Sequence, residues 1–305
     1  MTAPIPLAAT VLLLRENDAG LQVLPTKRAA GLSFMGGLWV FPGGRMEASD
    51  LAPELAARLD QAAIADTGSR MLSTDAGAET ASVDLDTARG LLVAACRETF
   101  EESGVLLARD RTGAPCPAVR SARLQAERAA VASNAAAFVE LLEREDLYLD
   151  LAPLVYWSHW ITPSLEPKRF DTRFFAIAVP PDQAASADRS ELTEHAWVRP
   201  ARAHEAIERR EIRVVPPTLL TLEDLAESHA RHGSIAAMLD AERGRATPPV
   251  MPRIEVRSDE FRVVMPWDAG YAQVAGEGCE PECGFPPHLT RRRSCVSVAR
   301  DREVR

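Results

Sequence analysis

One stretch, Arg97 to Val105, constrains the chain more than any other, and it reads Arg-Glu-Thr-Phe-Glu-Glu-Ser-Gly-Val. Its carboxylates Glu98, Glu101 and Glu102 stand at positions i, i+3 and i+4, so a helix places them on one face. Three like charges repel there, but a hard cation such as Mg²⁺ or Mn²⁺, which prefers carboxylate oxygens, would offset the repulsion. The alternative is a solvated helix face that ends at a capping glycine.

The sequence also predicts where this helix begins and ends. Asp86 and Thr87 are residue types that cap helix N-termini, so we expect the helix to start beside them and to run to Ser103. Gly104 fits the left-handed position that commonly follows a helix. The guanidinium of Arg97 can hold a neighbouring carboxylate by a forked ion pair.

The stretch Arg97 to Gly104 resembles the second half of the Nudix box, the signature of the Nudix hydrolases. The first half is not at its usual distance, but Phe41-Pro42-Gly43-Gly44 looks like the family's approach to the box, with Asp50 at its acidic position. Gly44 and Arg97 stand 53 positions apart, where the uninterrupted pattern has 14. The box therefore resembles one that is split by an insertion, which we place at about residues 51–85 and expect on the surface.

A split box is similar to that of the subgroup containing the mammalian peroxisomal coenzyme A diphosphatase, Nudix hydrolase nineteen. Three further segments resemble that subgroup, and the likeness covers about residues 7–270. They are Trp160-Ile161-Thr162-Pro163, Arg169 to Phe175, and Glu211-Ile212 followed by Pro216-Pro217.

This resemblance implies the α/β Nudix fold, a mixed sheet between helices, and a metal-dependent hydrolase of phosphoanhydrides. It implies that Glu98, Glu101 and Glu102 bind Mg²⁺ or Mn²⁺, together with the backbone carbonyl of Gly43. Glu101 would be a ligand or would take the proton of the attacking water, and Arg97 would orient a glutamate. Family members often place a further acidic residue, acting as a base or an extra metal ligand, in this region of the chain. Glu194 is the first candidate for this role and Glu191 is the second.

The split box favours coenzyme A or its thioesters as substrates, which would give 3′,5′-ADP and a phosphopantetheine product. Lys168 and Arg169, from a loop between two expected strands, are candidates to contact the 3′-phosphate, although surface cations are more often only solubilising. NADH, ADP-ribose and nucleotide sugars remain alternatives. An alternative of another class is a Nudix-fold nucleotide-binding regulator without catalysis.

Composition limits the partners. The formal net charge is −9, which argues against a nucleic-acid binder because such proteins carry a basic surface. The 5 cysteines are scattered and form no disulfide framework. The sequence contains no signal peptide and no apolar run long enough to cross a membrane. We therefore expect a cytoplasmic enzyme that acts on a small-molecule nucleotide diphosphate. A homodimer is compatible with the sequence.

Hydrophobic periodicity predicts the organisation along the chain. We expect one Nudix domain over residues 1–275, with a helical insertion at about 118–148 broken near Asn134, and a flexible tail at 276–305. His159 falls in an expected strand and is interpreted as a core histidine. The remaining expected elements are strands at 7–14, 21–24, 38–41, 154–161, 173–179 and 191–198, helices at 200–208 and 218–239, and a hairpin at 253–266.

Overall fold

The computed structural model describes residues 5–31, 35–72, 83–180, 183–185, 192–256, 260–279, 285, 290 and 295–299. The strands are β1 (Leu7–Asn17), β2 (Gly20–Val23), β3 (Thr26–Arg28), β4 (Trp39–Val40), β5 (Gly43–Arg45), β6 (Ala108–Arg109), β7 (Tyr148–Leu149), β8 (Val155–Ile161), β9 (Asp171–Ala178), β10 (Leu192–His195), β11 (Pro249–Val250), β12 (Arg253–Val256), β13 (Glu260–Val264) and β14 (Cys295–Ala299). The α-helices are α1 (Gln61–Leu72), α2 (Leu85–Ser103), α3 (Ala118–Leu124), α4 (Arg128–Ser133), α5 (Ala136–Arg144), α6 (Ala203–Glu208), α7 (Pro216–His232) and α8 (Ile235–Glu242). Short 3₁₀ helices are η1 (Ala48–Leu51), η2 (Pro53–Arg58), η3 (Gln125–Glu127), η4 (Pro200–Arg202) and η5 (Tyr271–Gln273).

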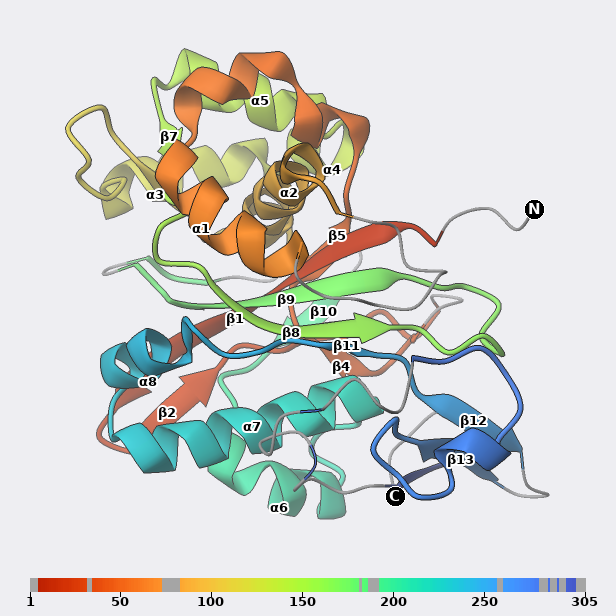
Figure 1. The fold of residues 1–305 in the computed structure, drawn as a ribbon. Helices are drawn as coiled ribbons and strands as arrows, with labels where there is room; N and C mark the ends of the chain where they lie inside the picture. The colour runs from red at the N-terminus through yellow and green to blue at the C-terminus, as the bar shows by residue number, and fades with distance from the viewer. Residues whose placement is uncertain are drawn as a thin grey trace.

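A mixed sheet forms the centre of the molecule (Figure 1). Its order is β11-β8-β9-β1-β2, with β5 also paired to β1. Strand β1 runs parallel to β9, whereas β8 runs antiparallel to β9. Because β1 is covered on both faces, its residues from Ala8 to Leu14 are all buried, and all of these except Thr10 are apolar. The mixed sheet confirms the predicted α/β class.

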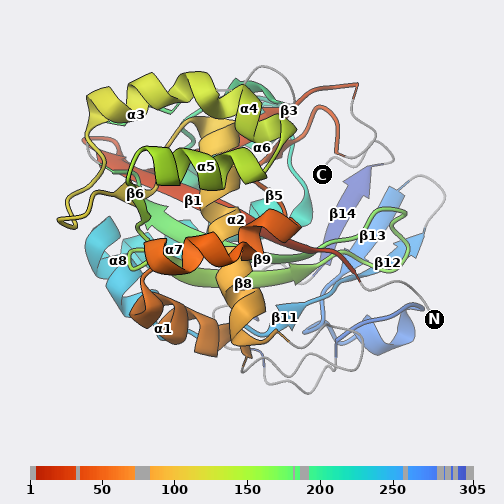
Figure 2. The same ribbon diagram turned by 90° about the horizontal axis from the view of Figure 1, so that it is seen from above.

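Helices cover both faces of this sheet (Figures 1 and 2). On β1, Val11 and Leu13 point into the core that packs against α2. Leu12 and Leu14 alternate with them and point into a second core, beneath α7 and α8. The sheet therefore lies between a layer containing α1 to α5 and a layer containing α6 to α8.

Helix α2 begins one residue after its cap. The cap is Asp84 rather than the expected Asp86 or Thr87, because the Asp84 carboxylate accepts a hydrogen bond from the backbone N–H of Thr87 at 2.7 Å. The helix ends as predicted at Ser103, and Gly104 follows with a left-handed φ of 72°. Most of the helix surface is buried, so its charged groups need partners inside the protein.

The insertion at 51–85 differs from its predicted surface position. Leu55, Ile64 and Met71 are all buried in the core beside α2. Helix α1 continues through Thr67 to Leu72, because one side of this stretch packs on α2. Residues 73–82 lie outside the described part of the chain.

Four further features of the fold can be compared with the sequence predictions. The predicted helix break occurs at Asn134, between α4 and α5. The expected helix at 218–239 is two helices, because Gly233 takes a left-handed φ of 79° and Ser234 caps α8. The tail is not entirely unstructured, since β14 pairs with β13. His159 is buried, as predicted, with its Nε2 atom 2.5 Å from the carboxylate of Asp171.

The described residues contain no helix that is both long and apolar enough to span a bilayer.

Candidate active site

A buried arginine organises the last turns of α2. The Arg97 side chain is 3% exposed, and its guanidinium makes a forked pair with Asp50 at 2.8 and 2.9 Å. Its other hydrogen bonds go to the carboxylates of Glu98 at 2.8 Å and Glu101 at 2.7 Å, and to the backbone carbonyl of Arg45 at 2.9 Å. These bonds use all the N–H donors of the guanidinium. Burial alone would lower the pKa of Arg97, but the bond to Asp50 and the surrounding carboxylates raise it above its ordinary value.

The two halves of the split box meet in space. The backbone N–H of Gly43 donates a hydrogen bond of 2.9 Å to the carboxylate of Glu102. A Cβ atom at Gly44 would lie 2.4 Å from the carboxylate of Glu98, so only glycine fits between β5 and α2. This juxtaposition is the one that the split-box interpretation predicts, and it holds although the insertion separates the two halves in sequence.

Glu98 has an unusual electrostatic environment. Its pKa is raised to about 7, mainly because the carboxyl is buried; the charge and hydrogen bond of Arg97 oppose this rise, and the charges of Glu101 and Asp50 add to it. Arg97 contacts three carboxylates, those of Asp50, Glu98 and Glu101, and Glu102 lies on the same helix turn as Glu101. The excess negative charge is what a bound divalent cation would neutralise.

The carboxylates suit Mg²⁺ or Mn²⁺ by their donor chemistry, because both ions prefer hard oxygen ligands. In the structure Glu98 and Glu101 face Arg97, and Glu102 faces the Gly43 amide. Among the residues that the structure describes, no group of three or more His, Cys, Asp or Glu side chains is positioned to hold a metal ion. The carboxylate side chains therefore have the chemistry to bind a divalent cation. The assignment of Glu98, Glu101, Glu102 and the Gly43 carbonyl as its ligands stays a prediction.

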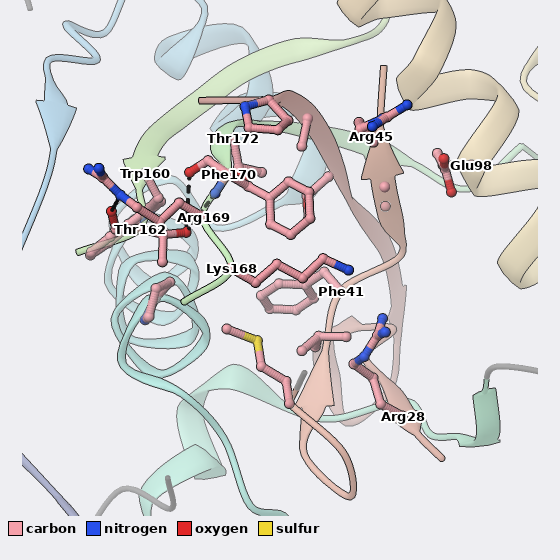
Figure 3. Close-up of a pocket in the computed structure, with 18 of the residues that line it drawn as sticks. Arg28, Phe41, Arg45, Glu98, Trp160, Thr162, Lys168, Arg169, Phe170 and Thr172 are labelled. Atoms are coloured by element: carbon pink, nitrogen blue, oxygen red, sulfur yellow. Dashed lines mark hydrogen bonds between the residues drawn. The ribbon is translucent and has the colours of Figure 1, made fainter. Parts of the chain in front are cut away.

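The carboxylates lie at one side of a cavity of about 1350 Å³. In Figure 3 the Lys168 side chain crosses this cavity above the ring of Phe41, with its ammonium on the side of Arg28, Arg45 and Glu98. These cations give the cavity groups that can bind phosphate.

The two predicted substrate-binding residues differ in orientation. Lys168 points into the cavity, and its ammonium lies 5.3 Å from the ring centroid of Phe170. The Arg169 guanidinium instead binds Glu277 at 2.7 Å and the carbonyl of Thr162 at 3.1 Å. Arg169 thus fastens the loop that carries Lys168.

The structure does not bring Glu194 to the other predicted residues. Glu194 lies on β10, its side chain is 57% exposed, and it pairs with Lys27 at 2.8 Å. It is absent from the cavity wall. Its alternative, Glu191, lies outside the described residues.

Sequence reasoning missed four charged residues of the cavity wall, namely Arg28, Arg45, Glu47 and Glu166. Arg45 directly follows Gly43-Gly44, so the box itself was a signal for it. Arg28 and Glu166 carry no comparable local signal, because only the tertiary fold places them at the cavity.

Comparison with known families agrees with this geometry. Residues 2–225 match the family model described as the NUDT19 Nudix domain. The chain belongs to this family. Nudix hydrolases generally use divalent metal ions, which suits the carboxylates of α2.

Curated relatives of this Nudix chain include two proteins named acyl-coenzyme A diphosphatase NUDT19. The chain is 28% identical to the one from Homo sapiens over 288 residues, covering 83% of this chain and 73% of that protein. It is 27% identical to the one from Xenopus laevis over 234 residues, covering 69% of this chain and 61% of that protein. The chain therefore spans about three fifths of the Xenopus relative.

A solved structure shares the fold. The NUDIX hydrolase from Alicyclobacillus acidocaldarius superposes with a TM-score of 0.53 at 28% sequence identity. The match covers 74% of this chain and 93% of that one.

Proposed function

We propose that this protein hydrolyses the diphosphate of coenzyme A or of an acyl-coenzyme A. The observation that carries the proposal is the placement of Glu98, Glu101 and Glu102, beside Gly43 and Gly44, at the wall of a large cavity that also holds cationic side chains. The names of the curated relatives favour coenzyme A thioesters over other nucleotide diphosphates.

In this proposal Glu98 and Glu102 would hold Mg²⁺ or Mn²⁺, with the backbone carbonyl of Gly43 as a further ligand. A bound ion of this kind neutralises phosphate charge and lowers the pKa of a water. Arg97 orients Glu98 and Glu101 through the hydrogen bonds described above.

The chain's own residues bind the substrate and move one proton. Lys168 contacts a phosphate of the substrate by a charge-assisted bond. Glu101 takes the proton of the attacking water, whose oxygen forms the new bond to phosphorus. The bridging P–O bond breaks, and the products are 3′,5′-ADP and phosphopantetheine or its acylated form.

A substrate panel tests this function. The purified full chain is incubated with Mg²⁺ or Mn²⁺ and with coenzyme A, acetyl-coenzyme A, NADH, ADP-ribose or UDP-glucose, and the products are identified by mass. We expect coenzyme A and its thioester to be cleaved, and the Glu102→Gln variant to be nearly inactive on both. Cleavage of only NADH, ADP-ribose or UDP-glucose overturns the substrate assignment. Binding without cleavage of any compound would indicate a nucleotide-binding regulator instead.

A further inference from the structure

The hairpin of β12 and β13 has one face that is entirely apolar. Its antiparallel register pairs Ile254 with Val263 and Val256 with Phe261. Directly paired residues project from the same side of a sheet, so these four side chains share one face.

The opposite face of the hairpin carries three charged residues and the buried Val264, which pairs with Arg253. Glu255 and Arg262 pair with each other there at 3.3 Å. Arg253 projects from the same side, and its guanidinium lies 4.4 Å from the ring centroid of Tyr271. The two faces therefore differ in polarity, which is typical of a strand pair with one face turned from water.

The apolar face forms a wall of the catalytic cavity. Ile254, Phe261 and Val263 line it. Val256 continues the same face but is 65% exposed, so the apolar strip extends further than the cavity. From Ile254 to Val256 the strand advances about 7 Å, which is the length of an alkyl chain of about six carbons.

Other apolar residues line the cavity as well. Trp160 and Phe174, from the central sheet, belong to the same apolar cluster as Val263 and Phe261. Val215, Pro216 and Pro217, at the start of α7, also line the cavity. The carboxylates come from α2, whereas the cations Arg28, Arg45 and Lys168 come from β3, β5 and the loop between β8 and β9. The cavity therefore combines groups that can bind a charged diphosphate with an apolar face of the β12–β13 hairpin.

This wall lies outside the matched Nudix domain. The family match ends at residue 225, and β12 begins at Arg253. Strand β14 pairs with β13 and completes a three-stranded sheet whose other two strands form this wall. The polypeptide beyond the Nudix domain thus shapes the substrate cavity.

We propose that the apolar face of β12 and β13 binds the fatty-acyl chain of an acyl-coenzyme A, and so selects medium-chain and longer thioesters over free coenzyme A. This inference rests on the proposed function. Adenine and the pantetheine amides carry hydrogen-bonding groups, and the face offers no polar side chain to satisfy them. A hydrocarbon chain has no hydrogen-bonding groups to satisfy. The cavity, of about 1350 Å³, is also larger than most small-molecule sites and so has room for an acyl chain.

The first test measures how catalysis depends on acyl length. Values of kcat/KM are compared for free coenzyme A and for butanoyl-, octanoyl- and dodecanoyl-coenzyme A, all below their micellar concentrations. Burial of each methylene group favours binding about threefold to fourfold, so octanoyl-coenzyme A should exceed free coenzyme A by at least about tenfold. Equal values for free and octanoyl-coenzyme A overturn this inference but leave the diphosphatase function intact.

Variants locate the effect on the hairpin. Ile254→Thr keeps a β-branched side chain but adds a hydroxyl, and it should reduce the octanoyl preference to about threefold or less while cleavage of free coenzyme A is retained. Glu255→Thr is the matched control, because this neighbouring side chain projects from the other face, and it should keep the full preference. If Ile254→Thr does not fold, Val256→Thr at its exposed position replaces it and should lower the rate with dodecanoyl-coenzyme A alone. An unchanged preference in the folded variant overturns the assignment.

An equilibrium measurement separates this inference from the catalytic one. Calorimetric titration of the metal-free protein with coenzyme A and with octanoyl-coenzyme A requires no turnover. Octanoyl-coenzyme A should bind at least about tenfold more tightly to the natural chain, and this gain should disappear in Ile254→Thr. Tighter binding without hydrolysis would refute the proposed function alone, whereas equal affinities would refute the acyl site.

Discussion

Replacement of Glu98 should make the metal-free protein more stable, and only at neutral to alkaline pH. The Glu98 carboxylate is buried with Glu101 and Asp50 nearby, and its pKa is raised to about 7. The unfolded chain releases this proton near its ordinary pKa of 4.5. Because the folded protein binds the proton more tightly, its stability falls as the pH rises from about 4.5 to about 7.

The expected magnitude follows from the two pKa values. Their difference corresponds to about 3 kcal/mol of unfolding free energy, at about 1.4 kcal/mol per pKa unit. Glutamine at position 98 removes the charge but retains an oxygen that can accept the hydrogen bond from Arg97. At about 2 °C per kcal/mol, Glu98→Gln should raise the Tm by about 4–6 °C at pH 8.

Thermal unfolding in EDTA at pH 5 and pH 8 measures this effect. Most of the gain should vanish at pH 5, where the carboxyl is protonated in the folded protein. Glu143→Gln is the control, because Glu143 is an exposed carboxylate on α5, and it should change the Tm little at either pH. A Tm difference between Glu98→Gln and the natural chain that is the same at both pH values would refute the electrostatic reasoning. Excess Mg²⁺ should raise the Tm of the natural chain more than that of Glu98→Gln.

Further variants test the site residue by residue. Glu101→Gln and Glu102→Gln should each lower kcat by at least about a hundredfold while leaving the circular dichroism spectrum unchanged. Gly44→Ala should lower kcat as well, because its Cβ atom would press on the Glu98 carboxylate, and normal kinetics would contradict the close approach. Lys168→Ala should reduce the preference for coenzyme A over dephospho-coenzyme A by about tenfold to a hundredfold, measured by kcat/KM, and hydrolysis of ADP-ribose serves as its control.

Local patterns predicted the parts of the fold that local chemistry determines. The apolar run of β1 and the capping glycine after α2 both depend on residues close in sequence, and both are confirmed. The break between α7 and α8 also had a local signal that the sequence analysis missed. Gly233 followed by Ser234 is a helix end followed by a helix cap.

Long-range packing determined the features that sequence reasoning got wrong. The apolar residues Leu55 and Met71 could lie on a surface helix or in the core, and only contact with α2 decides between them. Their burial also argues against removing the insertion, which would expose the core beside α2. Similarly, β14 is stabilised by pairing with β13, which no local pattern in a polar tail reveals.

The same limit applies to the cavity. Lys168 and Arg169 are adjacent cations in one loop, and the sequence predicts the same role for both. The carboxylate of Glu277, distant in the chain, binds Arg169 and leaves Lys168 as the one directed into the cavity. The different roles of Lys168 and Arg169 follow only from the tertiary fold, which places Glu277 against the loop that carries both residues.

The two halves of the box keep their contacts despite the insertion. The length of the chain between the halves affects stability less than the contacts between the halves do. Lengthening a flexible connection from 14 to 53 residues costs only about 1 kcal/mol of closure entropy. The packed insertion offsets part of this cost, since its buried side chains lie in the same core as α2. By contrast, the two halves are joined by two charge-assisted bonds from Arg97 to Asp50 and by the bond from the Gly43 amide to Glu102, each worth about 1.5–3 kcal/mol. The tertiary contacts therefore outweigh the chain entropy, and the geometry of the site is set by Arg97 rather than by the length of the segment that interrupts the box.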